Sequence, residues 1–68
     1  MAEALRNTLR AAREARGWTQ SQLADAIGVS RKTVNTVENG VFIPSTVIAL
    51  KLARALGCSV EALFSLEE

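Results

Sequence analysis

Side chains that form strong, directional hydrogen bonds are concentrated in one short segment, residues 31–39, which reads RKTVNTVEN. A helical period of about 100° per residue places Val34 and Val37 on one side of this segment. The opposite side then carries the polar residues Arg31, Lys32, Asn35, Thr36 and Asn39. We therefore expect the valines to attach a short helix to the rest of the chain, with its polar side facing outward.

These polar residue types have the chemistry that recognises base edges in the major groove of double-stranded DNA. Arginine can bond guanine through two hydrogen bonds, asparagine can bond adenine in the same way, and the threonine methyl group can contact thymine. Lysine can serve a base or a phosphate. A polar side of this kind could therefore meet base edges. Taken alone, however, a polar helix face also fits an ordinary solvated surface.

The chain offers little for other kinds of chemistry. It has one cysteine, Cys58, and no histidine, and its carboxylates are scattered. Neither a nucleophile–base pair nor a metal-ligand spacing is visible, so we expect no enzyme activity, no metal and no cofactor. Cys58 is predicted to pack in the core, because a redox-sensing thiol needs a nearby positive charge and only Lys51 and Arg54 are close in sequence.

Glycines and hydroxyl side chains divide the chain into five helical segments. The glycines follow apolar, helically periodic runs, where a left-handed residue ends a helix; they are Gly17, Gly28, Gly40 and Gly57. Each later run is preceded by a hydroxyl that can cap its first turn; these residues are Thr19, Ser30, Ser45 and Ser59. The sequence therefore predicts an all-α, compact five-helix bundle. Its first helix is expected from about Ala4 to Arg16, and its fourth is expected to end near Leu56.

The second and third of these segments form a recognisable pair. Residues 20–31 fit two helices joined by a tight turn at Gly28, which is the helix-turn-helix layout. Thr19 and Gln22 have the spacing of a capping box at the start of the first helix. Free backbone N–H groups at such a start attract phosphate. We therefore expect Thr19 and Gln20 to contact the DNA backbone.

The composition is that of one small globular domain, residues 1–68, with 49% apolar and 22% charged residues. Residues 1–54 hold all eight basic side chains and four acids, whereas residues 55–68 hold only Glu61, Glu67 and Glu68. A basic body with an acidic tail suits a polyanion, although scattered surface charge fits as well. No apolar run approaches 18 residues, so we expect no membrane span. A lone cysteine fits the cytoplasm.

The stretch WTQSQLADAIGVSRKTVNTVENG, followed by PSTVIALKLARALGCSVEALF, resembles the Cro/C1-type helix-turn-helix family. This family comprises phage repressors and bacterial transcription regulators and is also called the xenobiotic-response-element family. The resemblance covers about Leu9 to Phe64. It implies a five-helix domain whose third helix reads the major groove in a sequence-specific manner, and it favours a repressor.

The resemblance also implies roles for individual residues. Gln20 is expected to bond a phosphate and to brace the start of the third helix. The side chains expected to face base edges are Arg31, Lys32, Asn35 and Thr36. Thr33 and Asn39 are expected near phosphate, with the backbone N–H of Asn39 as a donor. Arg13 and Glu38 are expected to form a partly buried ion pair that ties the first helix to the third.

The chain departs from the family pattern at two places. Ala12 stands where the family usually has a larger aliphatic residue, so packing there is expected to rely on Trp18. The loop Val41–Ile43 is more apolar than the usual basic loop and offers less phosphate contact. Within it, Phe42 is predicted to fill the core, with contact to a partner as the alternative.

Surplus apolar residues near the C-terminus predict a second buried surface. A homodimer through the fifth helix and the end of the fourth would bury them, although scattered surface apolar residues are also normal. Such a dimer would set two recognition helices about 34 Å apart, matching half-sites of a palindromic operator. The candidate interface residues are Val47, Leu50, Leu63, Phe64 and Leu66.

Two classes of function therefore stay open from the sequence. The first is a DNA-binding transcription regulator, which includes an autonomous repressor, an antitoxin and the DNA-binding domain of a longer regulator. The second is a protein-interaction module that uses the same fold. DNA binding should weaken steeply with salt, with a log–log slope of about −0.9 per neutralised phosphate, so a salt titration separates the two.

Overall fold

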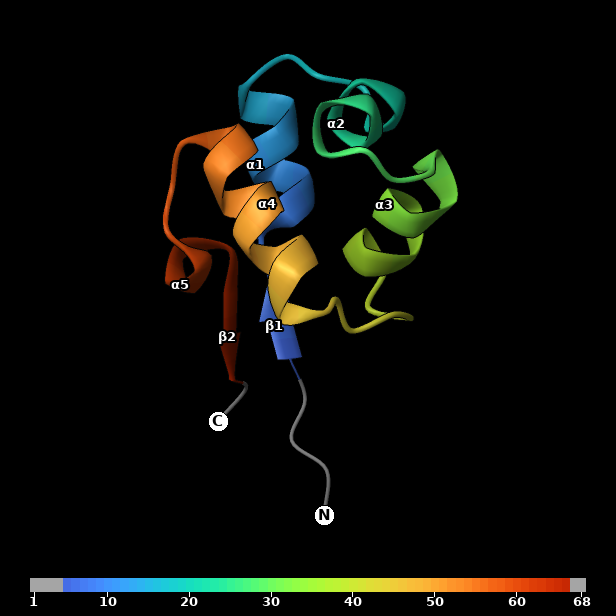
Figure 1. Cartoon of the computed structure of the whole chain (residues 1–68). Helices are drawn as coiled ribbons and strands as arrows, with labels where there is room; N and C mark the ends of the chain where they lie inside the picture. Colours follow the sequence, from blue (N-terminus) through green and yellow to red (C-terminus); the bar gives the residue numbers. More distant parts are fainter. Residues whose placement is uncertain (1–4, 67–68) are drawn as a thin grey trace.

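The computed structural model describes residues 5–66, which form five short helices and one two-stranded sheet (Figure 1). Figure 1 shows α2 and α3 on one side of the molecule and α5 with β2 on the other. In chain order the elements are β1 (Leu5–Asn7), α1 (Leu9–Ala15), α2 (Gln20–Ile27), α3 (Arg31–Glu38), α4 (Thr46–Leu56), α5 (Val60–Leu63) and β2 (Phe64–Leu66).

Hydroxyl caps start four of the helices where the sequence predicts them. At α2, Thr19 Oγ1 accepts a hydrogen bond of 3.1 Å from the Gln22 backbone, and the Gln22 side chain accepts one of 2.8 Å from the Thr19 backbone. The predicted capping box is therefore present. Ser30, Ser45 and Ser59 accept from the backbone N–H three residues further on and cap α3, α4 and α5.

The N-terminal segment differs from the prediction. Helix α1 covers only Leu9–Ala15, while Leu5–Asn7 forms strand β1, which pairs antiparallel with β2. The register places Leu5 opposite Leu66 and Asn7 opposite Phe64. The fold is thus mostly helical rather than all-α. Residue 4, where the first helix was expected to begin, lies outside the described residues, as do Glu67 and Glu68 of the acidic tail.

Hydrogen bonds from Asn7 and Thr8 explain why the helix starts late. The Thr8 backbone N–H donates to the carbonyl of Leu63 and its hydroxyl donates to that of Ala62, both at 2.9 Å. Asn7 Nδ2 donates to the carbonyl of Val37 at 3.1 Å. Asparagine and threonine readily bond backbone groups outside a helix. Here the accepting carbonyls belong to α5 and α3. Thr8 therefore joins the N-terminal segment to α5, and Asn7 joins it to α3.

The core lies between the helices, and both valines of α3 belong to it. Val34 is 2% exposed and Val37 is 1% exposed, which confirms that they anchor α3. Trp18 and Cys58 are partly buried and pack against this core, and the guanidinium of Arg16 stacks 4.8 Å from the centre of the Trp18 ring. The largest fully buried side chains are Leu9, Leu23, Leu52, Leu63, Val34 and Val37.

The helices are short. Within residues 5–66, none combines the length and the apolar character that a membrane crossing requires.

Candidate nucleic-acid interface

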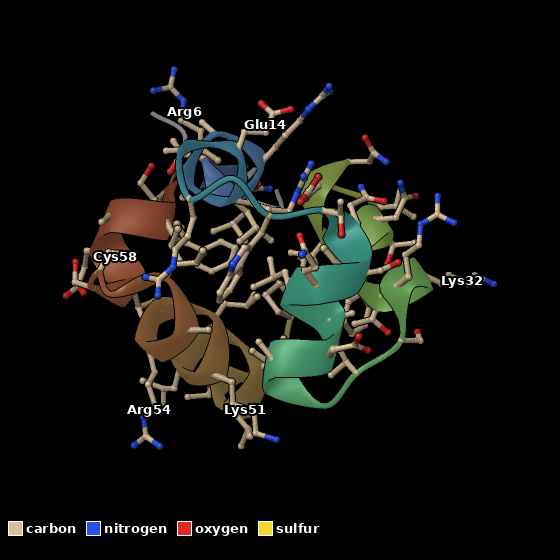
Figure 2. All side chains as sticks on the ribbon, turned by 90° about the horizontal axis from the view of Figure 1, so that it is seen from above. Arg6, Glu14, Lys32, Lys51, Arg54 and Cys58 are labelled. Atoms are coloured by element: carbon tan, nitrogen blue, oxygen red, sulfur yellow. The ribbon has the colours of Figure 1, made fainter. Side chains whose placement is uncertain are left out.

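Helix α3 lies at the surface with its valine side inward and its polar side outward. Arg31 and Lys32, at its start, are exposed. Figure 2 shows Lys32 extending away from the body of the protein, in a direction different from Lys51 and Arg54 of α4. The remaining predicted base-contacting residues, Asn35 and Thr36, are half-buried. The first turn of α3 thus presents two exposed cations, while its later turns present shorter polar groups.

A buried ion pair fixes the far end of α3 to α1. Arg13 Nε donates to Glu38 Oε2 at 2.6 Å and Arg13 Nη2 donates to Glu38 Oε1 at 3.2 Å. The side chain of Glu38 is 3% exposed and that of Arg13 is 10% exposed. Arg13 Nη1 also donates to the carbonyl of Trp18 at 2.7 Å. The predicted pair is therefore present, and one guanidinium joins α1, the loop before α2 and the end of α3.

The electrostatics of this pair favour the charged form of the arginine. The hydrogen bond to Glu38 raises the pKa of Arg13 above its ordinary value, and the negative charges of Glu38 and Glu14 act in the same direction. Desolvation by burial opposes them without reversing the outcome. Paired, hydrogen-bonded burial is the condition under which a charge is tolerated inside a protein. The pair therefore depends on both partners being present.

A chain of side-chain amides extends from the ion pair along α3. Gln20 Nε2 donates to Glu38 Oε1 at 3.1 Å, Asn35 Nδ2 approaches Gln20 Oε1 at 3.5 Å, and Asn39 Nδ2 donates to Asn35 Oδ1 at 3.3 Å. Gln20 thus braces the middle and end of α3, not its start as the resemblance implied. The difference arises because the Gln20 side chain extends from α2 to the turn of α3 that carries Glu38.

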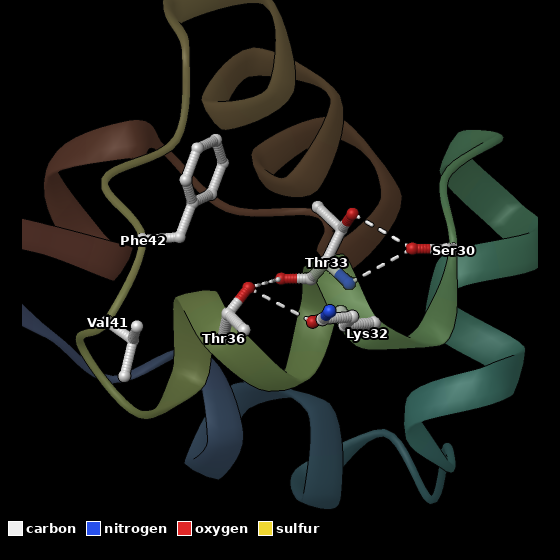
Figure 3. Close-up of a pocket in the computed structure, with 6 residues that line it drawn as sticks. All are labelled: Ser30, Lys32, Thr33, Thr36, Val41 and Phe42. Carbon is white, nitrogen blue, oxygen red and sulfur yellow. Dashed lines mark hydrogen bonds between the residues drawn. The ribbon is translucent and has the colours of Figure 1, made fainter.

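The threonines of α3 use their hydroxyls within the helix. Thr36 Oγ1 donates toward the backbone carbonyls of Lys32 and Thr33, each at 3.0 Å. Thr33 Oγ1 lies 3.0 Å from the hydroxyl of Ser30. Because the Thr36 hydroxyl already has its partners (Figure 3), the apolar methyl group is the part of Thr36 that is left for an external contact. Ser30 and Thr33 share a single hydrogen bond between their hydroxyls, so one of the two keeps a proton that can be donated to a phosphate.

The residues predicted to contact phosphate lie around the same helix pair. Thr19 is exposed at the start of α2, Thr33 is half-buried in the first turn of α3, and Asn39 is exposed just after α3. The backbone N–H of Asn39 donates to the carbonyl of Asn35 at 3.1 Å. That group is therefore not free for a phosphate, contrary to the expectation, and Asn39 offers its side chain instead.

The loop after α3 holds two features that the sequence did not indicate. Phe42 is 44% exposed and Val41 is 78% exposed, so the prediction that Phe42 fills the core is wrong. Gly40, at φ +72°, turns the chain back, and the N–H groups of Val41 and Phe42 both donate to the carbonyl of Thr36, at 3.0 and 3.1 Å. These bonds hold both apolar side chains beside the polar side of α3.

The predicted dimer residues fall into two groups. Leu63 and Phe64 are 2% and 9% exposed and belong to the chain's own core, so they add little surface for a partner. Val47, Leu50 and Leu66 are 61%, 56% and 60% exposed. Leu50 also lines an apolar groove of about 370 Å³. It is lined by Leu5, Ile43, Pro44, Thr46, Ala49, Leu50, Val60 and Phe64.

No metal centre is apparent in the part of the chain that the structure describes, where no three side chains of histidine, cysteine, aspartate or glutamate come together.

Comparison with known proteins identifies the family to which this fold belongs. A family model described as helix-turn-helix matches residues 9–63. An uncharacterised helix-turn-helix transcriptional regulator of Bacillus subtilis is 36% identical over 64 residues, which is 94% of this chain and 97% of that protein. The competence pilus inhibition repressor of Acinetobacter baylyi is 43% identical over 56 residues, covering 82% of this chain and 51% of the repressor.

Solved structures agree with this family. The restriction-modification controller protein C.AhdI from Aeromonas hydrophila superimposes with a TM-score of 0.76 at 41% identity, covering 79% of this chain and 82% of that one. A putative DNA-binding protein from Bacteroides fragilis reaches a TM-score of 0.81 over 90% of this chain and 98% of that one; at 21% identity it shows the fold alone. The chain therefore belongs to the Cro/C1-type helix-turn-helix family of DNA-binding transcriptional regulators, as its motifs predicted.

Proposed function

We propose that this protein binds a specific double-stranded DNA operator through α3 and acts there as a repressor in the cytoplasm. The observation that carries the proposal is the mounting of α3. Two buried valines and the Arg13–Glu38 pair hold it rigidly, while Arg31 and Lys32 stand exposed at its start. A rigid helix with a free polar side is what major-groove recognition requires. The relative named as a competence pilus inhibition repressor supports the direction of the effect.

Base contacts are assigned to Arg31, Lys32, Asn35 and Thr36. The two cations can reach furthest, because they are exposed and not held by other side chains in the described structure. Asn35 is oriented by Gln20 and Asn39, so it would meet a base edge with its amide already fixed. Thr36 offers its methyl group, since its hydroxyl bonds the helix backbone.

Phosphate contacts are assigned to Thr19, Gln20, Thr33 and Asn39. Thr19 and Gln20 lie at the N-terminus of α2, where backbone N–H groups and the helix dipole favour an anion. Because the Gln20 side chain is used by Glu38, its backbone N–H is the group we assign to the phosphate. These contacts position the domain and carry no sequence information.

A homodimer on a palindromic site is the second part of the proposal. The exposed Val47, Leu50 and Leu66, with the apolar groove that Leu50 lines, supply a surface that a second copy would cover. A two-fold dimer would present two copies of α3 to half-sites about 10 bp apart. Sedimentation of a monomer at tens of micromolar, both with and without operator DNA, would contradict this part.

The alternatives are a protein-interaction module and an antitoxin that use the same fold. An antitoxin of Escherichia coli, HipB, is 34% identical over 56 residues, covering 82% of this chain and 60% of HipB. The exposed apolar residues Val41–Ile43 favour a protein partner. The exposed Arg31 and Lys32 favour DNA instead.

Selection from a random DNA library tests the function directly. The wild-type protein should enrich one short sequence with two-fold symmetry, and the selected duplex should bind with an affinity that falls steeply with salt. Each neutralised phosphate contributes a log–log slope of about −0.9. Failure to enrich any sequence, together with salt-independent binding to a protein partner, would favour the alternatives.

A further inference from the structure

The outer side of α4 combines apolar and basic side chains in one patch. Val47 and Leu50 are 61% and 56% exposed, and Lys51 and Arg54 are exposed beside them. These four residues, which we call the α4 surface, line a shallow hollow of about 180 Å³. Figure 2 shows Lys51 and Arg54 on one side of the molecule, in a direction different from Lys32 of α3. The α4 surface is therefore separate from the surface that we assign to DNA.

The α4 surface has a regular spacing. Val47 and Lys51 are four residues apart, as are Leu50 and Arg54, so each apolar side chain has a cation one helical turn further along the same face. One turn rises about 5.4 Å. A segment that matches this surface therefore carries an apolar side chain and, within about 5–6 Å, negative charge.

The cations of the α4 surface have no acidic partner among the residues that the structure describes. In that part of the chain the ion pairs are Arg10–Glu14 and Arg13–Glu38. The same two cations line a second hollow, of about 300 Å³, whose other lining residues are apolar: Ala26, Ile27 and Ala55. Both charges are thus left for an anionic partner.

One segment of this chain has the complementary pattern. It is residues 66–68, Leu-Glu-Glu, which we call the tail segment. Leu66 ends β2 and is 60% exposed, whereas Glu67 and Glu68 lie outside the described residues. Two residues span at most about 7 Å, close to one turn of helix. With Leu66 against the apolar part of the α4 surface, both carboxylates come within reach of its cations.

The tail segment that fits belongs to a second molecule. Figure 1 shows β2 running toward the end of the molecule where α4 begins. Leu5, which pairs with Leu66, lines one groove together with Thr46, the first residue of α4. Arg54 lies about 12 Å further along the helix axis than Thr46, beyond the roughly 7 Å that two residues span. A chain's own glutamates are therefore badly placed for its own Arg54.

We propose that the tail segment of each molecule docks on the α4 surface of a second copy. Leu66 covers Val47 and Leu50, and the two glutamates pair with Lys51 and Arg54. The contact occurs twice in a two-fold dimer, because an isologous interface repeats every contact. This deepens the dimer part of the proposed function and rests on it. It also keeps the acidic residues on a surface separate from the one that approaches phosphate.

Charge reversal on one side at a time tests the proposal, because two reversed proteins should complement each other. The tail variant is Glu67→Lys with Glu68→Lys, and the α4 variant is Lys51→Glu with Arg54→Glu. Each variant alone brings like charges together, so its homodimer dissociation constant should rise about tenfold or more. In a mixture of the two, both contacts of the heterodimer join opposite charges. The heterodimer should therefore be nearly as tight as the wild-type dimer in sedimentation velocity, with one protein fluorescently labelled.

A matched control separates this contact from attraction between molecules of opposite net charge. Glu14→Lys with Glu61→Lys gives the same net charge as the tail variant and changes two exposed residues. Figure 2 shows Glu14 on the opposite side of the molecule from Lys51 and Arg54. In a mixture with the α4 variant, the control should bind about threefold or more weakly than the tail variant does. Circular dichroism checks that every variant keeps the fold.

Salt gives a second measurement, which needs only mild substitutions. The variant Glu67→Gln with Glu68→Gln should dimerise more weakly than the wild type at about 0.1 M salt. The ratio of their dissociation constants should fall toward one at about 1 M salt, where the Debye length shrinks to about 3 Å.

Several results would overturn the tail contact while leaving the dimer intact. In the first, the wild type dimerises but the mixture of reversed variants is no tighter than their homodimers. In the second, the control mixes as tightly as the tail variant, which would mark the attraction as one of net charge. A weakened α4 variant without rescue would show that the α4 surface meets another part of the second copy. A wild type that stays monomeric would remove the dimer itself from the proposed function, whereas DNA recognition is tested separately by library selection.

Discussion

The Arg13–Glu38 pair gives the sharpest test of how α3 is held. We consider Glu38→Gln, which keeps the shape of the side chain and one acceptor oxygen but removes the negative charge. Arg13 would then keep its bond to the carbonyl of Trp18 at 2.7 Å while losing its charged partner. With its side chain only 10% exposed, the guanidinium would be a nearly buried, unpaired cation.

The magnitude follows from the burial of both partners. Removing one partner of a buried pair costs about 3–5 kcal/mol, and we take about 3 kcal/mol because Arg13 keeps one bond and some exposure. A domain of this length is stable by only about 3–10 kcal/mol. The melting temperature should therefore fall by about 20 °C, since 1 kcal/mol shifts it by about 4–8 °C in domains of this size.

The double variant Arg13→Met, Glu38→Gln is the control that isolates the charge. It leaves no buried cation, and the glutamine that replaces Glu38 can still accept a hydrogen bond from Gln20. The double variant should therefore unfold at a temperature several degrees higher than Glu38→Gln alone. Thermal unfolding by circular dichroism measures all four proteins of the cycle. A shift below about 7 °C for Glu38→Gln, equivalent to about 1 kcal/mol, or a double variant as unstable as the sum of both single changes, would refute this reasoning.

The pH dependence of the same variant follows from the direction of the pKa shift. The pKa of Arg13 is raised in the folded state by its hydrogen bond to Glu38. A raised pKa stabilises the fold fully below the unfolded-state pKa, and the contribution is lost only as the pH rises through the folded-state pKa. For an arginine that loss lies in strongly alkaline solution. The penalty of Glu38→Gln should therefore be the same at about pH 7 and about pH 9, and a penalty that halves over this range would contradict the assignment.

Three further predictions concern packing, capping and assembly. Leu52→Ala should cost about 2–5 kcal/mol, because Leu52 is 1% exposed in the core; a denaturant midpoint equal to wild type would contradict this. Ser30→Ala should cost about 1 kcal/mol through loss of the α3 cap, and a melting temperature equal to that of the wild type would argue against a contributing cap. Leu50→Ser should raise the dimer dissociation constant, measured by sedimentation equilibrium, by about tenfold or more. The control Arg6→Ser changes an exposed residue of β1 and should leave this constant unchanged. Equal effects of the two substitutions would show that Leu50 is not in the interface.

Local signals predicted the helices well. The caps at Thr19, Ser30, Ser45 and Ser59 and the glycine stops act within one helical turn, so the residues that decide them are neighbours in the sequence. Val34 and Val37 were placed correctly for the same reason, because a helical period fixes which residues share a face.

Non-local features were missed. Strand β1 forms because Leu5–Asn7 meets Phe64–Leu66 at the other end of the chain, and no local pattern in three residues announces that pairing. Phe42 was expected inside because it is large and apolar. Whether a core has room for it depends on the packing of the surrounding helices and on the backbone bonds to Thr36 that hold the loop outward.

The candidate site was predicted in its residues but not in its connections. The pair Arg13–Glu38 followed from a family resemblance, not from spacing, because 25 residues separate the two. The sequence did not indicate that Gln20 would bond Glu38 and approach Asn35, since both contacts depend on how α2 crosses α3. The sequence also did not predict that the Thr36 hydroxyl would bond carbonyls of its own helix. A threonine hydroxyl can bond either solvent or a helix carbonyl, and the side-chain rotamer decides which.

The central claim is that the exposed side of α3 reads DNA bases, and Arg31→Ala tests it most directly. Parallel random-library selections with the wild type, Arg31→Ala and the control Arg54→Ala, whose side chain projects from α4, would compare preferred sequences (Figure 2). We predict that Arg31→Ala alone loses the preference for guanine at one position of each half-site, at a cost of about 1–3 kcal/mol. An unchanged preferred sequence in Arg31→Ala would contradict the claim.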